Sequence, residues 1–304
     1  MLEALKSIGA KISFSGEHNK LPIIIEGGFI DGSEVQIEQE SSSQFISALM
    51  MIGPFLPDGL RIKREGKRLS DSYIQLTKQV MEEVGFRAEI SENEIYIPRM
   101  KASIEKYTVE GDWSAAAYWM AFVVLVPEAK IKLKGLKENS AQGDKEMLTV
   151  LKDFGLEHQW EGENLILFRN KEIALPQQFT YDCSEIPDQA QTLAFLCAAL
   201  EIETKLTGLE TLYLKETNRV SALKNELEKL GLAVEVSDGS LSFKGAIGVD
   251  TIKIATYNDH RMAMAGALLG CRIVVEIEQA EVVSKSYPSY WTDLKLITSA
   301  SAPE

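Results

Sequence analysis

Cysteine is scarce in this sequence, and long hydrophobic runs are missing. Only three cysteines occur among 304 residues, at Cys183, Cys197 and Cys271. An odd number of widely separated cysteines argues against a disulfide framework or a zinc site and favours a reducing compartment. The apolar run at residues 120–126 is far too short for a membrane span, and the chain does not begin with a signal-peptide pattern. We therefore expect a cytoplasmic protein that does not contact a membrane.

Basic residues are also in short supply. The 32 lysines and arginines face 45 aspartates and glutamates, which gives a net charge of −13. Such a chain is not expected to bind nucleic acid, because it would be repelled by the phosphates. Against this background, a local group of lysines and arginines becomes informative. The length and the ordinary composition, 45% hydrophobic and 25% charged, allow two globular domains.

A repeated pattern runs along the chain. The segments "MEEVGFRAEISENEIYI", "LKDFGLEHQWEGENLILF" and "LEKLGLAVEVSDGSLSF" each contain a helix end, a glycine and two short strands around a polar turn. The glycines, Gly85, Gly155 and Gly231, are 70 and 76 residues apart, and Gly9 lies another 76 residues upstream of Gly85. Each repeat also holds a nearly all-apolar helix, a strand and an amphipathic helix. The pattern predicts βαβαββ units and an α/β (α+β) fold class.

Both ends of the sequence fall inside such a unit. Residues 1 to about 30 correspond to the second half of a unit, and no final hairpin follows the helix-like stretch "SYPSYWTDLKLI". The expectation is a C-terminal portion of a longer repeat protein. The alternative is an unusual natural start with an independent fold.

Six short polar stretches lie where helices are expected to begin. They occupy residues 41–45, 68–73, 185–189, 214–219, 258–263 and 284–290. A helix N-terminus offers free N–H groups and a partial positive charge, so it favours phosphate or carboxylate. Taken singly, each stretch has a simpler interpretation as a helix cap or a solvated turn. Together they predict anion-binding ends that converge on one cleft.

The segments "EGDWSAAAYW", "IPDQAQTLAF", "LKETNRVSAL", "YNDHRMAMA" and "SKSYPSYW" resemble, in order and spacing, the motifs of the 5-enolpyruvylshikimate-3-phosphate synthase family. This resemblance covers essentially the whole chain. It implies two inverse-barrel-like domains of βαβαββ units. The first, incomplete domain would comprise residues 1–110 on the shikimate 3-phosphate side. The second would comprise residues 111–304 on the phosphoenolpyruvate side and would lack its N-terminal strands.

The implied reaction transfers the enolpyruvyl group of phosphoenolpyruvate to the 5-hydroxyl of shikimate 3-phosphate and releases phosphate. It belongs to the shikimate pathway, which leads to chorismate and the aromatic amino acids. Neither a metal nor a cofactor is expected. The implied partners are the two small-molecule substrates, and the full-length enzyme is expected to be a monomer.

The resemblance also assigns roles to residues at matching positions. The implied contacts to shikimate 3-phosphate are Ser42, Ser43, Gln44, Ser70, Tyr73, Asp188 and Lys215, and those to phosphoenolpyruvate are Gln44, Arg219, Arg261 and Lys285. Asp188 would take the proton from the 5-hydroxyl, Glu216 would serve proton transfer at the methylene carbon, and Lys215 would bridge both substrates. The supporting residues would be Asp112, Asp259 and His260, with His260 either orienting its neighbours or simply packing. Carboxylates suit acid–base work on two atoms, and arginine suits bidentate capture of an anion.

The chain departs from the family pattern at several places. The family's N-terminal Lys-Ser segment, its Gly-rich loop and two further arginines have no counterpart here, so we expect weak turnover or none. Thr211, Asn218 and Ala115 are milder departures. The alternatives are UDP-N-acetylglucosamine enolpyruvyl transferase, a non-catalytic binding module on the same fold, and an acidic interaction domain. The intact "LKETNR" and "NDHRMAM" motifs favour the shikimate 3-phosphate enzyme.

Overall fold

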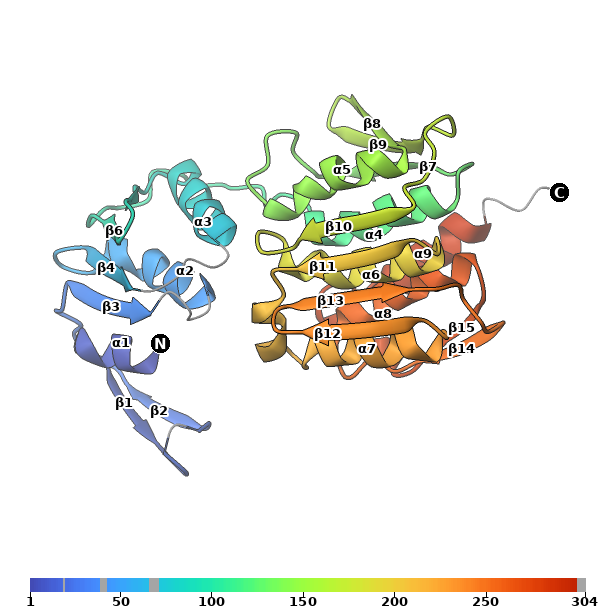
Figure 1. Ribbon diagram of the computed structural model, residues 1–304. Helices are drawn as coiled ribbons and strands as arrows, with labels where there is room; N and C mark the ends of the chain where they lie inside the picture. The colour runs from blue at the N-terminus through green and yellow to red at the C-terminus, as the bar shows by residue number, and fades with distance from the viewer. Residues whose placement is uncertain (19, 39–42, 66–70, 300–304) are drawn as a thin grey trace. The chain divides into compact units, whose positions relative to one another are not determined.

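The chain divides into two compact units in its computed structural model, which describes residues 1–18, 20–38, 43–65 and 71–299 (Figure 1). Unit 1 comprises Met1–Val109 and unit 2 comprises Glu110–Glu304. Both units mix helices and strands, which confirms the predicted α/β class, and the sheets that the structure describes are open. Within the described ranges, no helix is both long and apolar enough to cross a membrane.

The predicted βαβαββ unit occurs in full in each of the two units. In unit 1 the sheet has the order β3 (Glu34–Glu38), β4 (Leu60–Glu65), β6 (Glu94–Ile97), β5 (Glu89–Ile90). In unit 2 the equivalent order is β10 (Gln178–Asp182), β11 (Glu203–Thr207), β13 (Ser240–Lys244), β12 (Ala233–Ser237). In both sheets the first two strands are parallel, and the hairpin that follows pairs antiparallel to the second strand. The repeat therefore exists in the strand pairing as well as in the sequence.

Helices connect the strands in the same order in both copies. The copy in unit 1 has α2 (Ser43–Ile52), η1 (Gly53–Phe55) and α3 (Asp71–Glu83). The copy in unit 2 has η4 (Pro187–Gln189), α6 (Ala190–Ala199), η5 (Glu210–Leu214) and α7 (Arg219–Lys229). A crossover helix between parallel strands is the usual way to join them, because the chain must return to the starting edge.

The remaining elements form smaller sheets. Unit 1 begins with α1 (Leu2–Ser7) and an antiparallel hairpin of β1 (Lys11–Phe14) and β2 (Ile23–Glu26). Unit 2 begins with α4 (Trp113–Leu125), β7 (Lys130–Lys134), η2 (Gly143–Glu146), α5 (Met147–Val150), η3 (Leu151–Phe154), β8 (Leu156–Glu161) and β9 (Asn164–Arg169). It ends with β14 (Thr251–Ile254), α8 (His260–Gly266), η6 (Ala267–Cys271), β15 (Val274–Ile277), η7 (Ala280–Lys285) and α9 (Tyr290–Ser299). The amphipathic helix expected before Gly155 is therefore divided into two 3-10 segments around a short α-helix.

The four glycines that mark the repeat all adopt left-handed backbone conformations. Their φ angles are 103° at Gly9, 93° at Gly85, 84° at Gly155 and 89° at Gly231. A residue without a Cβ adopts this conformation without strain, and it stops a helix by turning the chain out of it. The periodic glycine is thus the local cause of the helix-to-hairpin switch in every copy.

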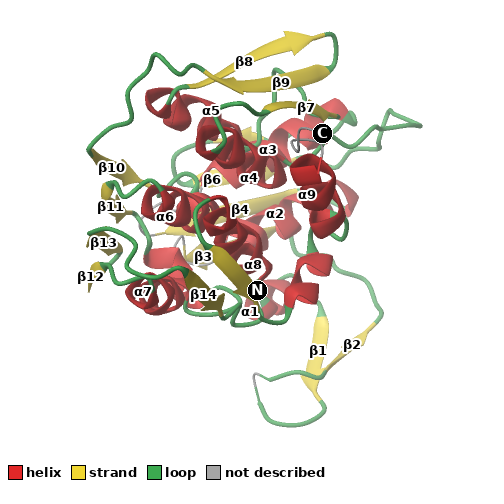
Figure 2. Cartoon of the chain, turned by 90° about the vertical axis from the view of Figure 1, so that its right-hand side faces the viewer, coloured by secondary structure: helices red, strands yellow, loops and turns green. Residues whose placement is uncertain are grey.

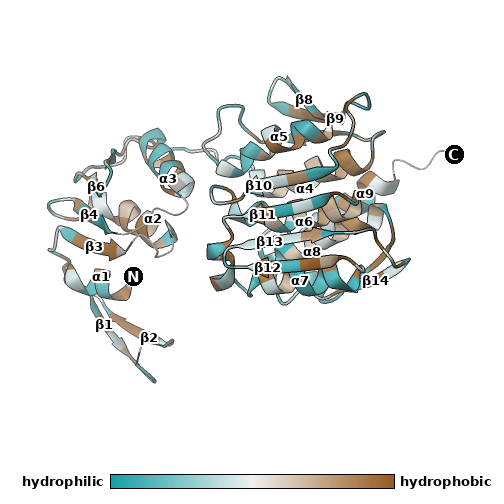
Figure 3. Cartoon of the chain, viewed as in Figure 1, coloured by the Kyte–Doolittle hydropathy of each residue, from teal (hydrophilic) through white to brown (hydrophobic). Residues whose placement is uncertain are grey.

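The core of unit 2 is built from helices that have no polar face. All ten residues of α6 are buried, and α4 is buried continuously from Ala116 to Val124. Such helices cannot lie at the surface, so α4 packs against α6 and α6 against α8 in the interior, while the strands β10–β13 lie outside them (Figure 2). In Figure 3, α4, α6 and α8 are mostly brown, whereas the amphipathic α7 is more teal. Each large apolar side chain buried in this way contributes about 1.5–3 kcal/mol.

Candidate active site

Several helix starts of unit 2 bring charged residues together. Asp188 lies in η4 just before α6, Lys215 and Glu216 precede α7, and Arg219 is the first residue of α7. Asp259 caps α8, Arg261 lies in its first turn, and Lys285 ends η7. Together these residues form a charged cluster, which comprises Asp188, Lys215, Glu216, Arg219, Asp259, Arg261 and Lys285. Packing of α6 against both α7 and α8 is what brings these segments close.

Arg219 is the centre of the charged cluster. Its side chain is almost wholly buried, and its Nη1 donates to Asp188 Oδ1 at 2.8 Å and its Nη2 to Glu216 Oε2 at 2.9 Å. Its Nε donates to Asp259 Oδ2 at 2.6 Å, and Nη2 also reaches Asp259 Oδ1 at 3.4 Å. One guanidinium therefore joins three carboxylates from three segments. Asn218 caps the same helix by accepting from Ser221 N at 3.0 Å, so the departure at this position keeps a capping oxygen.

Arg261 holds Asp188 from the other side. Its Nη2 donates to Asp188 Oδ2 at 3.1 Å and its Nη1 to the Asp188 carbonyl oxygen at 3.2 Å. The same Nη2 lies 3.5 Å from Ser114 Oγ on α4. Asp188 is thus fixed by two arginines, which orients both of its oxygens.

The two lysines lie closer to solvent. Lys215 Nζ is 3.4 Å from Asp188 Oδ1, and its side chain is 27% exposed. Lys285 Nζ forms an ion pair with Glu216 Oε1, and its side chain is 56% exposed. These ammonium groups are therefore the parts of the charged cluster that an entering anion can reach with the least rearrangement.

The cations control the protonation of the two catalytic candidates. Burial alone would raise the pKa of Asp188, but Arg261, Lys215 and Arg219 together hold that pKa well below its usual range. Burial likewise acts to raise the pKa of Glu216, yet the hydrogen bond from Lys285 and the charge of Arg219 lower it to about 2. Both carboxylates are consequently ionised near neutral pH when the site holds no substrate.

His260 contributes little hydrogen bonding in this arrangement. Its ring is 7% exposed and its Nδ1 lies 3.8 Å from Asp259 Oδ1, which is too long for a hydrogen bond. Among the described residues this Nδ1 has no hydrogen-bond partner. Burial and the neighbouring Arg261 lower the pKa of His260, so the ring is neutral at physiological pH. These contacts favour the packing interpretation over an orienting role.

Asp112 acts as a helix cap, and its neighbourhood contains a residue that the sequence analysis missed. The Asp112 side chain accepts from Ser114 N at 2.8 Å at the start of α4. The Ser114 hydroxyl in turn donates to Asp144, a buried carboxyl whose pKa is raised by burial and lowered again in part by Arg261. Gln142, two residues before Asp144, also holds the start of α4, because its Oε1 accepts from Trp113 N at 3.0 Å. Asp144 thus reaches Arg261 through Ser114.

The expected contacts to shikimate 3-phosphate in unit 1 are only partly described. Ser42 and Ser70 lie outside the described residues. Ser43 and Gln44 begin α2, and Tyr73 lies in the first turn of α3. These two helices pack against each other, and Thr77 Oγ1 of α3 donates to Ser47 Oγ of α2 at 2.7 Å. The two helices that carry these residues are therefore neighbours within unit 1.

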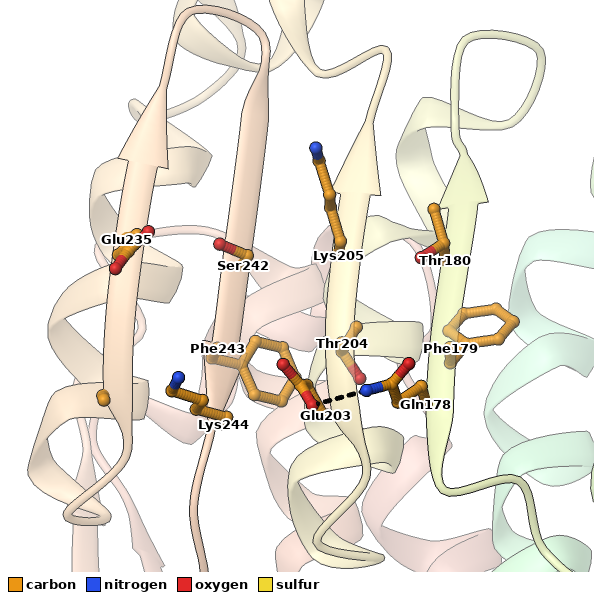
Figure 4. A pocket seen from close by; sticks show the side chains of 11 residues that line it. Gln178, Phe179, Thr180, Glu203, Thr204, Lys205, Glu235, Ser242, Phe243 and Lys244 are labelled. Carbon is orange, nitrogen blue, oxygen red and sulfur yellow. Dashed lines mark hydrogen bonds between the residues drawn. The ribbon is translucent and has the colours of Figure 1, made fainter.

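Two hollows of unit 2 lie apart from the charged cluster. Figure 4 shows one of about 300 Å³ on the solvent-facing side of the sheet β10–β11–β13–β12, where Gln178 Nε2 donates to Glu203 Oε2 at 2.9 Å. A larger one of about 910 Å³ lies between α4, β7 and α9 and includes Asp112 and Tyr287 in its lining. Neither is lined by Arg219, Arg261 or Lys285. The candidate site in this unit is identified by the convergence of its charged side chains.

Comparison with known proteins agrees with the motifs. The family model of EPSP synthase (3-phosphoshikimate 1-carboxyvinyltransferase) matches residues 1–294. The chain is 39% identical over 300 residues to a 3-phosphoshikimate 1-carboxyvinyltransferase of Bacteroides fragilis, covering 97% of this chain and 73% of that protein. A protein of the same name from Photobacterium damsela subsp. piscicida is 31% identical over 302 residues, covering 98% and 70%.

Solved structures share the fold at lower sequence identity. An EPSP synthase from Acinetobacter baumannii superimposes with a TM-score of 0.73 at 21% identity, covering 97% of this chain and 69% of that one. The enolpyruvyl transferase NikO from Streptomyces tendae gives a TM-score of 0.68 at 15% identity, covering 98% and 70%. With the family match along nearly the whole chain, these likenesses show that the chain belongs to the EPSP synthase (3-phosphoshikimate 1-carboxyvinyltransferase) family.

Proposed function

We propose that this chain is a transferase that moves the enolpyruvyl group of phosphoenolpyruvate to the 5-hydroxyl of shikimate 3-phosphate and releases phosphate. The reaction is a step of the shikimate pathway, which leads to chorismate and the aromatic amino acids. The observation that carries the proposal is the convergence of Lys215, Arg219, Arg261 and Lys285 around Asp188 and Glu216 in a member of this family. Both substrates are phosphorylated anions, and the chain as a whole is acidic, so the cations are concentrated where they are needed.

Without substrate, the cations of the charged cluster are paired with its carboxylates. Its four cations face the three carboxylates of Asp188, Glu216 and Asp259. An entering anion must therefore exchange with a carboxylate for at least one cation. Lys285 is the most exposed of these cations, so we assign it the first contact with the phosphate or carboxylate of phosphoenolpyruvate, followed by Arg261 and Arg219.

This exchange supplies a reason for Glu216 to become an acid. With Lys285 bound to it, the pKa of Glu216 is about 2, so it carries no proton to give. A substrate anion that takes over Lys285 removes this hydrogen bond, and the partial burial of Glu216 then raises its pKa. Glu216 can thereby take up a proton and deliver it to C3 of phosphoenolpyruvate, which leaves C2 cationic.

Asp188 is placed to act at the other reacting atom. Arg219 and Arg261 hold its two oxygens, and Lys215 lies beside Oδ1. As these cations turn to the substrate anions, the pKa of Asp188 rises toward the range in which a carboxylate is an effective base. Asp188 then accepts the proton of the 5-hydroxyl while that oxygen attacks C2. Loss of a proton from C3 and of phosphate from C2 leaves the enolpyruvyl ether.

Unit 1 would hold the acceptor. We assign Ser42, Ser43, Gln44, Ser70 and Tyr73 to shikimate 3-phosphate, with Gln44 also serving phosphoenolpyruvate. The ends of α2 and α3 suit this role because helix N-termini attract phosphate. Domain boundaries at 1–110 and 111–304 are part of the same proposal.

Three further expectations complete it. The reaction needs neither metal nor cofactor, the full-length enzyme is a monomer, and the chain works in the cytoplasm, which the three free cysteines favour.

In the deciding experiment, the purified chain is mixed with phosphoenolpyruvate and shikimate 3-phosphate. The enolpyruvyl product is followed by mass spectrometry, which is sensitive enough to detect product after only a few turnovers. The expected result is a product and released phosphate that both depend on the two substrates together. Asp188→Asn, which keeps the shape but cannot accept the proton, should abolish both. UDP-N-acetylglucosamine is the control acceptor, and product from it alone would contradict the proposal.

A further inference from the structure

The loop that leads into α8 has a backbone conformation that one of its residues, Tyr257, does not favour. Tyr257 and Asn258 have φ angles of 54° and 58°, and Asp259 N donates to Thr256 O at 2.8 Å. This is a tight four-residue turn whose two central residues both have positive φ, an arrangement normally filled by Asn-Gly or Gly-Gly. A bulky tyrosine in the first central position is uncommon because its Cβ crowds the backbone. The surrounding structure must therefore hold the turn in place.

A buried carboxylate on α7 provides that support. Glu226 is fully buried, and its Oε1 accepts from the Tyr257 hydroxyl at 2.7 Å while its Oε2 accepts from Ala255 N at 3.3 Å. Lys229 Nζ lies 2.7 and 2.8 Å from the same two oxygens and neutralises them. A buried carboxylate persists only with such partners, because its desolvation is otherwise uncompensated.

The far end of the turn is held by the same helix. Asp259 is fully buried, accepts twice from Arg219, and accepts from Arg261 N at 2.9 Å. Arg219 and Glu226 are seven residues apart on α7, which places them on one face of the helix. Helix α7 thus holds the turn at both ends. Glu226 accepts hydrogen bonds from Ala255 and Tyr257, and Arg219 donates to Asp259.

We propose that Glu226 and Tyr257 are positioning residues for the donor side of the site: they hold the turn at residues 256–259 so that Asp259 keeps the Arg219 guanidinium aimed between Asp188 and Glu216. This inference rests on the proposed function. Neither residue touches the reacting atoms, so their effect passes through Asp259. The sequence motifs do not include Glu226, and nothing in the reaction itself requires it.

The first test measures how firmly Arg219 is held by Asp259, and it does not depend on turnover. The exchange rate of the Arg219 Nε–H proton is measured by 15N NMR, with the signal assigned by its loss in Arg219→Lys. In Glu226→Gln and in Tyr257→Phe we expect exchange at least about tenfold faster, because the Nε–H bond to Asp259 opens more often. The matched control is Glu228→Gln, on the same helix, which breaks only the exposed pair with Lys224 at 3.8 Å and should leave the rate unchanged. Unchanged exchange in both test variants would overturn the proposal.

The second test measures kcat and the KM for each substrate. Tyr257→Phe should raise the KM for phosphoenolpyruvate and lower kcat, together by about 10–100-fold in kcat/KM, with the KM for shikimate 3-phosphate within about twofold of wild type. Adding Asn258→Gly should restore part of the loss, since glycine adopts positive φ without support. An equal rise in both KM values, or no rescue, would contradict the proposal.

The two tests also separate this inference from the function on which it rests. If wild type forms product only with UDP-N-acetylglucosamine, the proposed function fails, and if it forms no product at all, the proton exchange alone decides the positioning role. If Glu226→Gln does not fold, Tyr257→Phe, which removes a single oxygen, decides both tests.

Discussion

Arg219 Nε lies 2.6 Å from Asp259 Oδ2, and both side chains are almost completely shielded from solvent. The pair joins the start of α7 to the start of α8, two segments that are 40 residues apart. Breaking a buried pair leaves one charge without compensation in a medium of low dielectric. The Arg219–Asp259 pair therefore stabilises the fold of unit 2 and also belongs to the candidate active site.

Arg219→Lys should damage both stability and activity. A lysine ammonium cannot contact Asp188, Glu216 and Asp259 simultaneously in the planar arrangement of a guanidinium. We expect a loss of about 3–5 kcal/mol in the free energy of unfolding and at least a 100-fold drop in kcat/KM. Urea denaturation and steady-state kinetics measure the two effects. Arg272→Lys, outside the charged cluster, is the control, and a loss no greater than in this control would contradict the prediction.

Stability should fall in acid partly through Glu216. The folded-state pKa of Glu216, about 2, lies below its ordinary value of 4.5. A lowered pKa means that the ionised group stabilises the fold above about pH 4.5 and loses this contribution as the pH falls toward 2. Because the side chain is partly exposed and screened, the contribution is on the order of 1–2 kcal/mol. The lowered pKa of Asp188 acts in the same direction.

Glu216→Gln isolates this contribution. Urea denaturation at pH 7, 5 and 3 should show a difference between wild type and variant that is present at pH 7 and shrinks by pH 3. A difference that stays constant over this range would show that protonation of Glu216 does not cause the loss.

Lys285→Gln should separate donor binding from folding. The lysine is 56% exposed, so its pair with Glu216 contributes less than about 1 kcal/mol to stability. Removing it takes away the most accessible cation, and we expect the KM for phosphoenolpyruvate to rise at least about tenfold. Lys253→Gln removes a comparably exposed lysine from the pair β14–β15 and serves as the control. Equal effects of the two substitutions on this KM would refute the assignment of Lys285.

Gly231→Ala should weaken unit 2 through the backbone alone. The residue has a φ of 89°, and an added Cβ would meet no atom closer than 3.6 Å. The expected loss of about 1–2 kcal/mol is then the strain of a left-handed alanine. Gly270→Ala is the matched control, because that glycine has neither a positive φ nor a neighbouring atom within 4 Å. Thermal unfolding of both variants checks the prediction, which fails if Gly270→Ala is destabilised as much.

Local patterns accounted for much of the fold in advance. The glycine spacing predicted the helix-to-hairpin switch, and the apolar stretches "SAAAYWMAF" and "AQTLAFLCAAL" predicted the buried helices α4 and α6. These features depend on residues close in sequence, where backbone preference and side-chain periodicity act directly. The amphipathic helix before Gly155 was less regular than expected, because its flanks adopt 3-10 geometry.

The sequence predicted which residues belong to the candidate site, but not how these residues contact one another. Motifs named Asp188, Lys215, Glu216, Arg219, Arg261 and Lys285, and the structure brings all six together. They did not indicate that Arg219 would be the most buried of them, nor that Asp144 would reach Arg261 through Ser114.

The sequence by itself determined the repeat, the capping glycines, the buried helices and the identity of the charged residues, since each of these is a property of neighbouring positions. Only the tertiary structure decided how those charges pair, which carboxylates lose their protons most readily, and how Glu226 supports the turn before Asp259. The reason is that pairing depends on distances between helix ends that are far apart in the chain. Those distances are set by how α6, α7 and α8 pack, and no local pattern encodes them.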